Sequence, residues 1–267
     1  MRKIVTFFIV ASLLLLAVPV LAQESGPAYV RIELWDVKRA QWSAFIKMYE
    51  KYDKPVYEKL FADDVITEYG IESAMLHNPE DYTHATWHAA TSMEAFGKVR
   101  EAFEAAYKAL GEAEMARVDT EFANMLVKHR DFLWRTDYQK AKEAKLENAY
   151  YYETSGAVKL GQASSYVSYW NEHTKPVYQK LMDEGIIVAY GRSREEITTG
   201  RENRIFSWYV VRDLAGHDKV QAARRDSWGR MSEEQRRARW ASIEAFAEPG
   251  SYREYMSRLH DWAVKER

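Results

Sequence analysis

Hydrophobic and polar residues alternate along residues 29–35, YVRIELW, which is typical of a β-strand with one apolar face. Residues 41–62 change to helical spacing. Two further alternating stretches, 65–71 and 83–90, flank a polar loop around NPED, as in a β-hairpin. Residues 94–128 return to helical spacing, interrupted at Gly111, and a short strand is expected at 132–136. The order strand, helix, hairpin, helix, strand is that of a ferredoxin-like unit.

The same pattern occurs twice along the chain. When the chain is shifted by 121 residues, residues 28–70 align with 149–191 without a gap. Lys-Pro-Val-Tyr at 54–57 recurs at 175–178, Tyr-Gly at 69–70 recurs at 190–191, and Trp87 aligns with Trp208. The second half predicts strands at 149–154, 186–190, 205–211 and 252–258, with helices at 162–182 and up to 247. We therefore expect an α+β protein of two ferredoxin-like repeats, residues 23–140 and 141–267.

Each Lys-Pro-Val-Tyr segment places a proline inside a predicted helix, where proline costs about 3 kcal/mol. Asp53 and Thr174 stand two residues before the two prolines, and both residue types are good N-caps. Because proline is tolerated in the first turn of a helix, we predict that each helix breaks and restarts at this point.

The sequence resembles the dimeric α/β-barrel superfamily. The resemblance rests on a helix with an internal Lys-Pro-Val-Tyr, then a Lys-Leu pair, an acidic or glycine turn and a strand ending in Tyr-Gly. The NIPSNAP-like, EthD-like and antibiotic-monooxygenase-like proteins of that superfamily are the most similar. The resemblance implies that two antiparallel sheets pair into one barrel with helices outside. Both units would lie in one chain, as in chlorite dismutase-like proteins, so a monomeric pseudo-dimer or a homodimer is expected. It also implies that haem ligation by one histidine is possible.

The first 22 residues have the features of a secretory signal peptide. Arg2 and Lys3 precede an apolar run from 4 to 16, Pro19 ends it, and Val20-Leu21-Ala22 suits cleavage after Ala22. The run is short for a bilayer span, which makes an uncleaved anchor the weaker alternative. We expect a secreted or periplasmic protein without membrane association after cleavage.

Composition narrows the candidate functions. The chain has no cysteine, which excludes disulfides, thiol nucleophiles and iron–sulfur clusters. Loss of Arg2 and Lys3 changes the formal charge from −2 to −4, and both signs are interspersed, so no nucleic-acid partner is expected. The 9 Trp, 18 Tyr and 10 Phe suit a cavity lined by rings, and hence a small apolar or aromatic ligand.

The alternation also predicts which side chains face the barrel interior. If the apolar faces of the strands meet the helices, a polar set in the first repeat lines the lumen. This set includes Arg31, Glu33, Glu68, His84, Thr86 and His88. The second repeat has lost their charged and imidazole groups, because the matching residues, in the same order, are Tyr152, Thr154, Ala189, Ile205, Ser207 and Tyr209. This loss of charge predicts one asymmetric pocket in the first repeat, with His84, His88 and Glu68 as acid–base candidates and Tyr29, Arg31, Glu33, Trp35, Thr86, Tyr152 and Tyr209 as ligand-binding candidates. The alternative is a structural ion pair between Arg31 and Glu33 or Glu68.

Metal binding by the two histidines together is unfavourable. Four residues of strand separate His84 from His88 by about 13 Å, too far for one ion. We therefore predict no cofactor, while haem or a single metal ion remains an alternative.

Three hypotheses follow for the function. The first is an exported small-molecule-binding barrel, with a cofactor-free oxygenase-like or acid–base enzyme as its catalytic version. The second is a non-catalytic exported interaction or scaffold module, and the third is a haem- or metal-binding barrel.

Overall fold

The computed structural model describes residues 28–76, 82–197 and 203–265. The predicted signal peptide lies outside these residues. The first repeat contains β1 (Ala28–Val37), α1 (Trp42–Met48), α2 (Lys54–Ala62), β2 (Glu68–Ala74), β3 (His84–Ala90), α3 (Met93–Ala109), α4 (Glu112–Met125) and β4 (Leu126–Ala141). The second contains β6 (Tyr150–Ala157), α5 (Ala163–Tyr169), α6 (Lys175–Asp183), β7 (Ile187–Ile197), β8 (Arg204–Val211), α7 (Leu214–Gly229), α8 (Glu233–Phe246) and β9 (Arg253–Val264). The short β5 (Lys145–Leu146) connects the two repeats.

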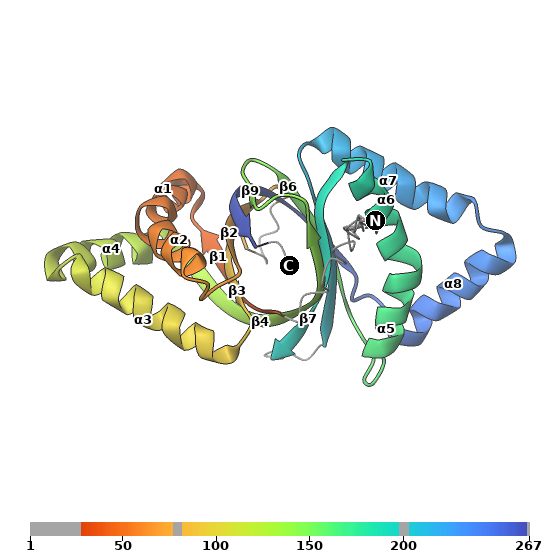
Figure 1. Ribbon diagram of the computed structural model, residues 1–267, viewed down its shortest axis with the longest axis horizontal. Coiled ribbons are helices and arrows are strands. Elements are labelled where there is room, and N and C mark those ends of the chain that lie inside the picture. The colour runs from red at the N-terminus through yellow and green to blue at the C-terminus, as the bar shows by residue number, and fades with distance from the viewer. Residues whose placement is uncertain (1–27, 77–81, 198–202, 266–267) are drawn as a thin grey trace, which may run out of the picture.

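The strands form one closed antiparallel barrel. Their order is β2-β3-β1-β4-β7-β8-β6-β9, and β9 pairs back with β2. Each repeat thus contributes a four-stranded sheet, and the sheets join at β4–β7 and β9–β2. Helices α1 to α4 cover one sheet and α5 to α8 the other, with the barrel between them (Figure 1). The prediction of an α+β barrel built from two ferredoxin-like repeats is confirmed.

The recurring glycine and tryptophan have a shared structural role. Gly70 is the strand partner of Trp87, and Gly191 is the strand partner of Trp208. A Cβ on Gly70 would lie 2.7 Å from Trp87 Cη2 and 2.8 Å from the carbonyl oxygen of Asp261. A Cβ on Gly191 would lie 2.7 Å from Trp208 Cε2. In both repeats the indole occupies the space that any larger residue would need.

The proline segments do not break the helix, so the predicted restart is wrong. A π-helical turn, Tyr49–Asp53, joins α1 directly to α2, and Trp170–Thr174 does the same between α5 and α6. Asp53 and Thr174 have helical backbone angles and make no side-chain cap. The wider π turn accommodates a proline that cannot donate its i→i−4 hydrogen bond.

The lysine of each Lys-Pro-Val-Tyr segment reaches the other repeat. Lys54 Nζ lies 3.0 Å from Asp261 Oδ2 on β9, and Lys175 Nζ lies 4.0 Å from the ring centre of Tyr138 on β4. The tyrosine of each segment packs on the tyrosine of Tyr-Gly, as Tyr57 does on Tyr69 at 5.8 Å. The motif therefore stabilises the two seams of the barrel.

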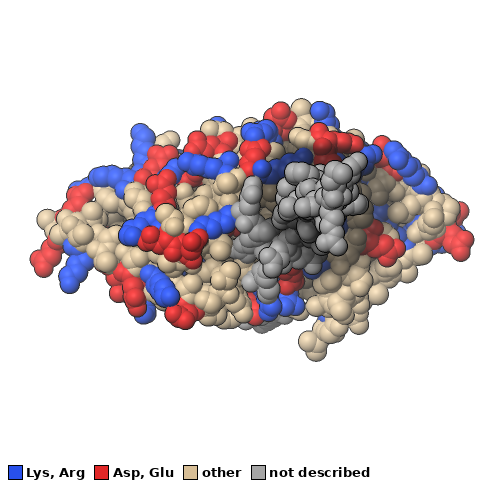
Figure 2. Space-filling view, in the orientation of Figure 1, with Lys and Arg blue, Asp and Glu red and all other residues tan. Residues whose placement is uncertain are grey.

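Several boundaries differ from the predicted ones. The second long helix ends at Met125, and β4 continues as a strand for 16 residues where only a short strand was expected. The last strand runs from Arg253 to Val264, further than expected. In the described ranges no helix is long and apolar enough to cross a membrane. Acidic and basic side chains are interspersed over the face seen in Figure 2.

Candidate functional site

The faces of β1 and β3 are inverted relative to the prediction, whereas Glu68 of β2 lines the lumen as predicted. The lumen is lined by Val30, Ile32 and Leu34 of β1 and by Ala85 and Trp87 of β3. Their polar neighbours on the same strands face the helices instead: Arg31, Glu33, Trp35, Thr86 and His88 line a separate cavity there. Both faces of each sheet are covered, one by helices and one by the opposite sheet. Polarity along a strand therefore does not reveal which face is the lumen.

The lumen holds a cavity of about 320 Å³. Aromatic rings from both repeats line this cavity. Trp134 of β4 and Phe206 of β8 stack on each other, with ring centres 3.8 Å apart. The indole Nε1 of Trp134 is buried and has no hydrogen-bond partner within the described chain. Four buried carboxylates share the cavity with these rings: Glu68, Glu72, Glu153 and Glu195.

Glu68 lies at the centre of a hydrogen-bond network that joins the repeats. Trp87 Nε1 and Trp262 Nε1 donate to Oε1 at 3.0 and 2.9 Å, and Gln139 Nε2 donates to Oε2 at 2.9 Å. These donors come from β3, β9 and β4. Because all three donors are neutral, they orient and stabilise the carboxylate without supplying a counter-ion.

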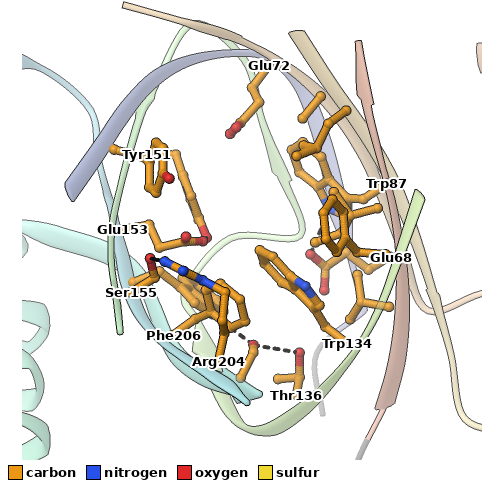
Figure 3. A pocket seen from close by; sticks show the side chains of 18 of the residues that line it. Glu68, Glu72, Trp87, Trp134, Thr136, Tyr151, Glu153, Ser155, Arg204 and Phe206 are labelled. Atoms are coloured by element: carbon orange, nitrogen blue, oxygen red, sulfur yellow. Dashed lines mark hydrogen bonds between the residues drawn. The ribbon is translucent and has the colours of Figure 1, made fainter. Parts of the chain in front are cut away.

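Glu72 and Glu153 point into the lumen from different walls (Figure 3). Tyr82 donates to Glu72 at 3.2 Å, and Tyr151 donates to Glu153 at 2.6 Å. Burial raises the pKa of Glu72 to about 8, with a further contribution from the charge of Glu153. Burial likewise raises the pKa of Glu153 to about 7. Both groups therefore change their protonation near neutral pH.

Two arginines bring positive charge to the lumen wall. Arg204 Nη2 donates to Ser155 Oγ at 2.7 Å, and the Arg204 charge lowers the pKa of Glu153 against the effect of burial. Arg130 lines the cavity but is exposed. The positive charge thus lies on the β8 and β4 walls, away from β2.

The helix-side cavity of the first repeat measures about 310 Å³. Trp35 Nε1 donates to Thr86 Oγ1 at 2.9 Å, and Thr86 donates to Glu33 Oε2 at 3.2 Å. Arg31 Nη2 pairs with Glu33 Oε1 at 3.0 Å. The predicted ion pair of Arg31 with Glu33 is present, and it lies in this cavity.

A second carboxyl group lies in the helix-side cavity. Tyr107 donates to Asp53 Oδ1 at 2.9 Å, and burial raises the pKa of Asp53 to about 7. The buried hydroxyl of Tyr49, another lining residue, has no partner in the described part of the chain. This cavity therefore combines a titratable acid with an unused hydrogen-bonding group.

The three predicted acid–base residues are not brought together. Glu68 faces the lumen, whereas His88 lies in the helix-side cavity with Nδ1 3.4 Å from the Tyr57 hydroxyl. His84 is 1 % exposed and packs against Trp42 and Phe45. Burial lowers the pKa of each histidine to about 3, so both imidazoles are neutral.

The other predicted ligand-binding residues lie outside the lumen. The ring of Tyr29 lies 5.9 Å from the guanidinium of Arg135. Tyr152 and Tyr209 pack together in the helix-side core of the second repeat, where Tyr152 donates to Glu254 and Tyr209 pairs with His217. Tyrosines thus occupy the positions that match Arg31 and His88 of the first repeat.

One group of side chains in the described residues has the donor types that a metal ion requires. Glu33, His129 and Asp131 are close enough to share an ion, but the Arg31 guanidinium lies 3.0 Å from Glu33 and 3.4 Å from Asp131 and competes with an ion for their oxygens. No histidine lines the lumen within the described ranges, so the lumen offers haem iron no imidazole ligand.

Sequence reasoning missed Glu72, Glu153 and the wall around Trp134. The strand was expected to end at residue 71, one position before Glu72, although Glu72 shares its face with Glu68. Glu153 aligns with the apolar Ile32, so a search for charges lost from the first repeat does not find it. The recurrence of tryptophan at 87 and 208 could have identified the face of β3 and β8 that lines the lumen, since both indoles lie there.

Comparisons with known proteins agree on the fold. No protein-family model matches the sequence, and curated proteins give no match. A solved structure described as a "putative monooxygenase" from Lactobacillus acidophilus NCFM is 11 % identical with a TM-score of 0.57, covering 90 % of this chain and 97 % of its own. Another so described, from Fusobacterium nucleatum, is 10 % identical with a TM-score of 0.59, covering 90 % and 96 %. The chain has the dimeric α/β-barrel fold.

A shorter solved structure belongs to the NIPSNAP family. This Agrobacterium tumefaciens protein is 12 % identical, covers 42 % of the present chain and 88 % of its own, and has a TM-score of 0.30. At 10 and 11 % identity, the two structures described as monooxygenases are similar to this chain in fold alone.

Proposed function

We propose that this protein binds a small, largely apolar or aromatic molecule inside the barrel lumen. The observation that carries the proposal is the cavity of about 320 Å³, lined by indole and phenyl rings and a few buried polar groups. That volume and lining are typical of sites for small ligands. The unpartnered Trp134 Nε1 supports it, because a buried donor is costly unless a bound molecule accepts its hydrogen bond.

A neutral apolar dye tests lumen binding without knowledge of the natural ligand. Nile red should bind with a blue-shifted emission at one molecule per chain. Ala85→Phe places a ring in the lumen and should abolish the signal, whereas the matched Val99→Phe places a ring in the helix-side cavity and should leave it intact. Loss of signal with Val99→Phe alone would assign the dye to the helix-side cavity and contradict the proposal.

We also propose that the protein works after export, with its mature chain beginning at Gln23. The charged start, apolar run and Val20-Leu21-Ala22 support this. Expression in a bacterial host, followed by intact-mass measurement of the periplasmic fraction, should give the mass of residues 23–267. A full-length mass in the membrane fraction would contradict it.

A second candidate function is acid–base chemistry in the helix-side cavity, including cofactor-free oxidation of an aromatic substrate. The favouring observation is Asp53, whose pKa of about 7 suits a general base at neutral pH. The barrels described as monooxygenases share the fold, which makes the reaction worth testing. Oxygen uptake with a hydroquinone should require Asp53 and disappear in Asp53→Asn. Uptake that is equal in both proteins would refute this role.

A further inference from the structure

We propose that the lumen selects a ligand carrying a protonated amine, with the cation held at Glu68 and Glu72 on β2. This inference rests on the proposed binding function and adds the chemical class of the ligand. Both glutamates line the cavity and are buried, with 8 % and 4 % of their surface exposed. Within the described ranges, no lysine or arginine forms an ion pair with either of them. The hydrogen-bond donors to both glutamates are neutral, so a carboxylate buried here has no counter-ion, and a ligand cation would supply one.

The surroundings of Glu68 favour a cation over a neutral donor. Trp87 and Trp262 both direct their N–H groups to Glu68 Oε1, which fixes the position of this carboxylate in the lumen wall. An ammonium group would make a charge-assisted hydrogen bond to it, which is stronger than one from a neutral donor. The stacked Trp134 and Phe206 offer an apolar surface for the rest of the ligand.

The charges in the lumen are distributed unequally, which gives a ligand a preferred direction. At the positions equivalent to Glu68 and Glu72, β7 carries Ala189 and Ser193. The opposite sheet carries Glu153 and Glu195 as well, but it also carries Arg204, whose charge acts on Glu153 and would repel a cation. An amine should therefore point toward β2, with its apolar part toward Trp134 and Phe206.

Cation binding should also release protons. The other titratable or charged groups lining the cavity around Glu72 and Glu153 are Glu68, Tyr82, Tyr151, Glu195, Arg130, Arg204 and Tyr255. Glu72 and Glu153 are partly protonated at pH 7, because burial and mutual repulsion disfavour two charges. An ammonium ion offsets that repulsion and so favours ionisation. Binding of an amine at pH 7 should then be accompanied by loss of a proton from the protein.

Three naphthalenes of matched shape test the proposal by calorimetry: 1-naphthylmethylamine, 1-naphthalenemethanol and 1-naphthoate. The amine should bind on the order of tenfold more tightly than the alcohol, and the acid more weakly than both. Titrations in two buffers of different ionisation enthalpy should reveal proton release with the amine alone.

Two isosteric variants and one surface control complete the experiment. Glu68→Gln and Glu72→Gln should each bring the amine toward the affinity of the alcohol, while Glu58→Gln, the same change on the exposed face of α2, should leave the preference unchanged. Circular dichroism must show a native melting curve for each variant. If one fails to fold, the buffer-dependent proton release of the wild type still tests the claim.

The outcomes separate the two proposals. Equal affinity for amine and alcohol, or no naphthalene binding by a protein that binds Nile red in the lumen, overturns the amine inference and leaves the binding function standing. Failure of Nile red and all three naphthalenes to bind overturns both.

Discussion

Gly70→Ala is the perturbation whose effect the fold specifies most closely. The new methyl group would lie 2.7 Å from Trp87 Cη2 and 2.8 Å from the Asp261 carbonyl oxygen. The backbone at Asp261 is held in the closed barrel by its strand pairing with β2, so the Trp87 indole must move to relieve the overlap. Overpacking of this kind costs about 1–3 kcal/mol, while alanine regains about 0.4–1 kcal/mol through the unfolded chain. We expect a net loss of about 1 kcal/mol in the free energy of unfolding.

Urea unfolding followed by tryptophan emission measures this loss. Gly191→Ala, which meets Trp208 in the same way, should lose a similar amount. Gly97→Ala is the control, because nothing lies within 4 Å of its new Cβ in the interior of α3. There alanine should stabilise by up to about 1 kcal/mol. Ordinary surface substitutions change the free energy of unfolding by up to about 0.5 kcal/mol. A loss for Gly70→Ala below that value would show that the indole of Trp87 does not need the space beside residue 70.

Three further substitutions test other parts of the structure. Lys54→Met should cost about 2–3 kcal/mol in urea unfolding, because it leaves Asp261 buried without its partner; a neutral result would show that the seam ion pair is unimportant. Glu72 has a raised pKa, so it stabilises the folded protein at low pH, and that stability is lost as the pH rises from about 4.5 through about 8. Glu72→Gln should therefore flatten the pH dependence of the melting temperature over that window, and an unchanged slope would contradict the assignment. Tyr49→Phe removes a hydroxyl without a partner and should be neutral or stabilising, whereas Tyr107→Phe loses the bond to Asp53 and should cost about 1 kcal/mol; the reverse order in thermal melts would be inconsistent with these contacts.

The overall fold was predictable because the sequence pattern of one repeat occurs twice in the chain. The Lys-Pro-Val-Tyr and Tyr-Gly segments recur at one fixed offset. In both repeats their tyrosines pack together and their lysine contacts the other repeat. The proline at residue 55 misled the local interpretation. A π turn with a hydrogen bond from Lys54 N–H to the Tyr49 carbonyl keeps the helix continuous, and no capping signal distinguishes it.

The candidate site was less predictable because both faces of each sheet are buried. Val30, Ile32 and Leu34 meet the opposite sheet in the lumen, while Arg31 and Glu33 pair with each other beneath the helices. An alternating pattern identifies two faces but does not say which one the helices cover. The long-range partners of Glu68 come from residues 139 and 262, so no local motif could indicate them.

The most direct test of ligand binding in the lumen is the location of a heavy atom. Crystals grown with a bromonaphthalene, with data collected at the bromine edge, would give one anomalous peak per bound probe. Our account predicts that peak inside the ring of eight strands, beside Trp134 and Phe206. A peak in the helix-side cavity bounded by Tyr49 and Asp53, with none in the lumen, would contradict it.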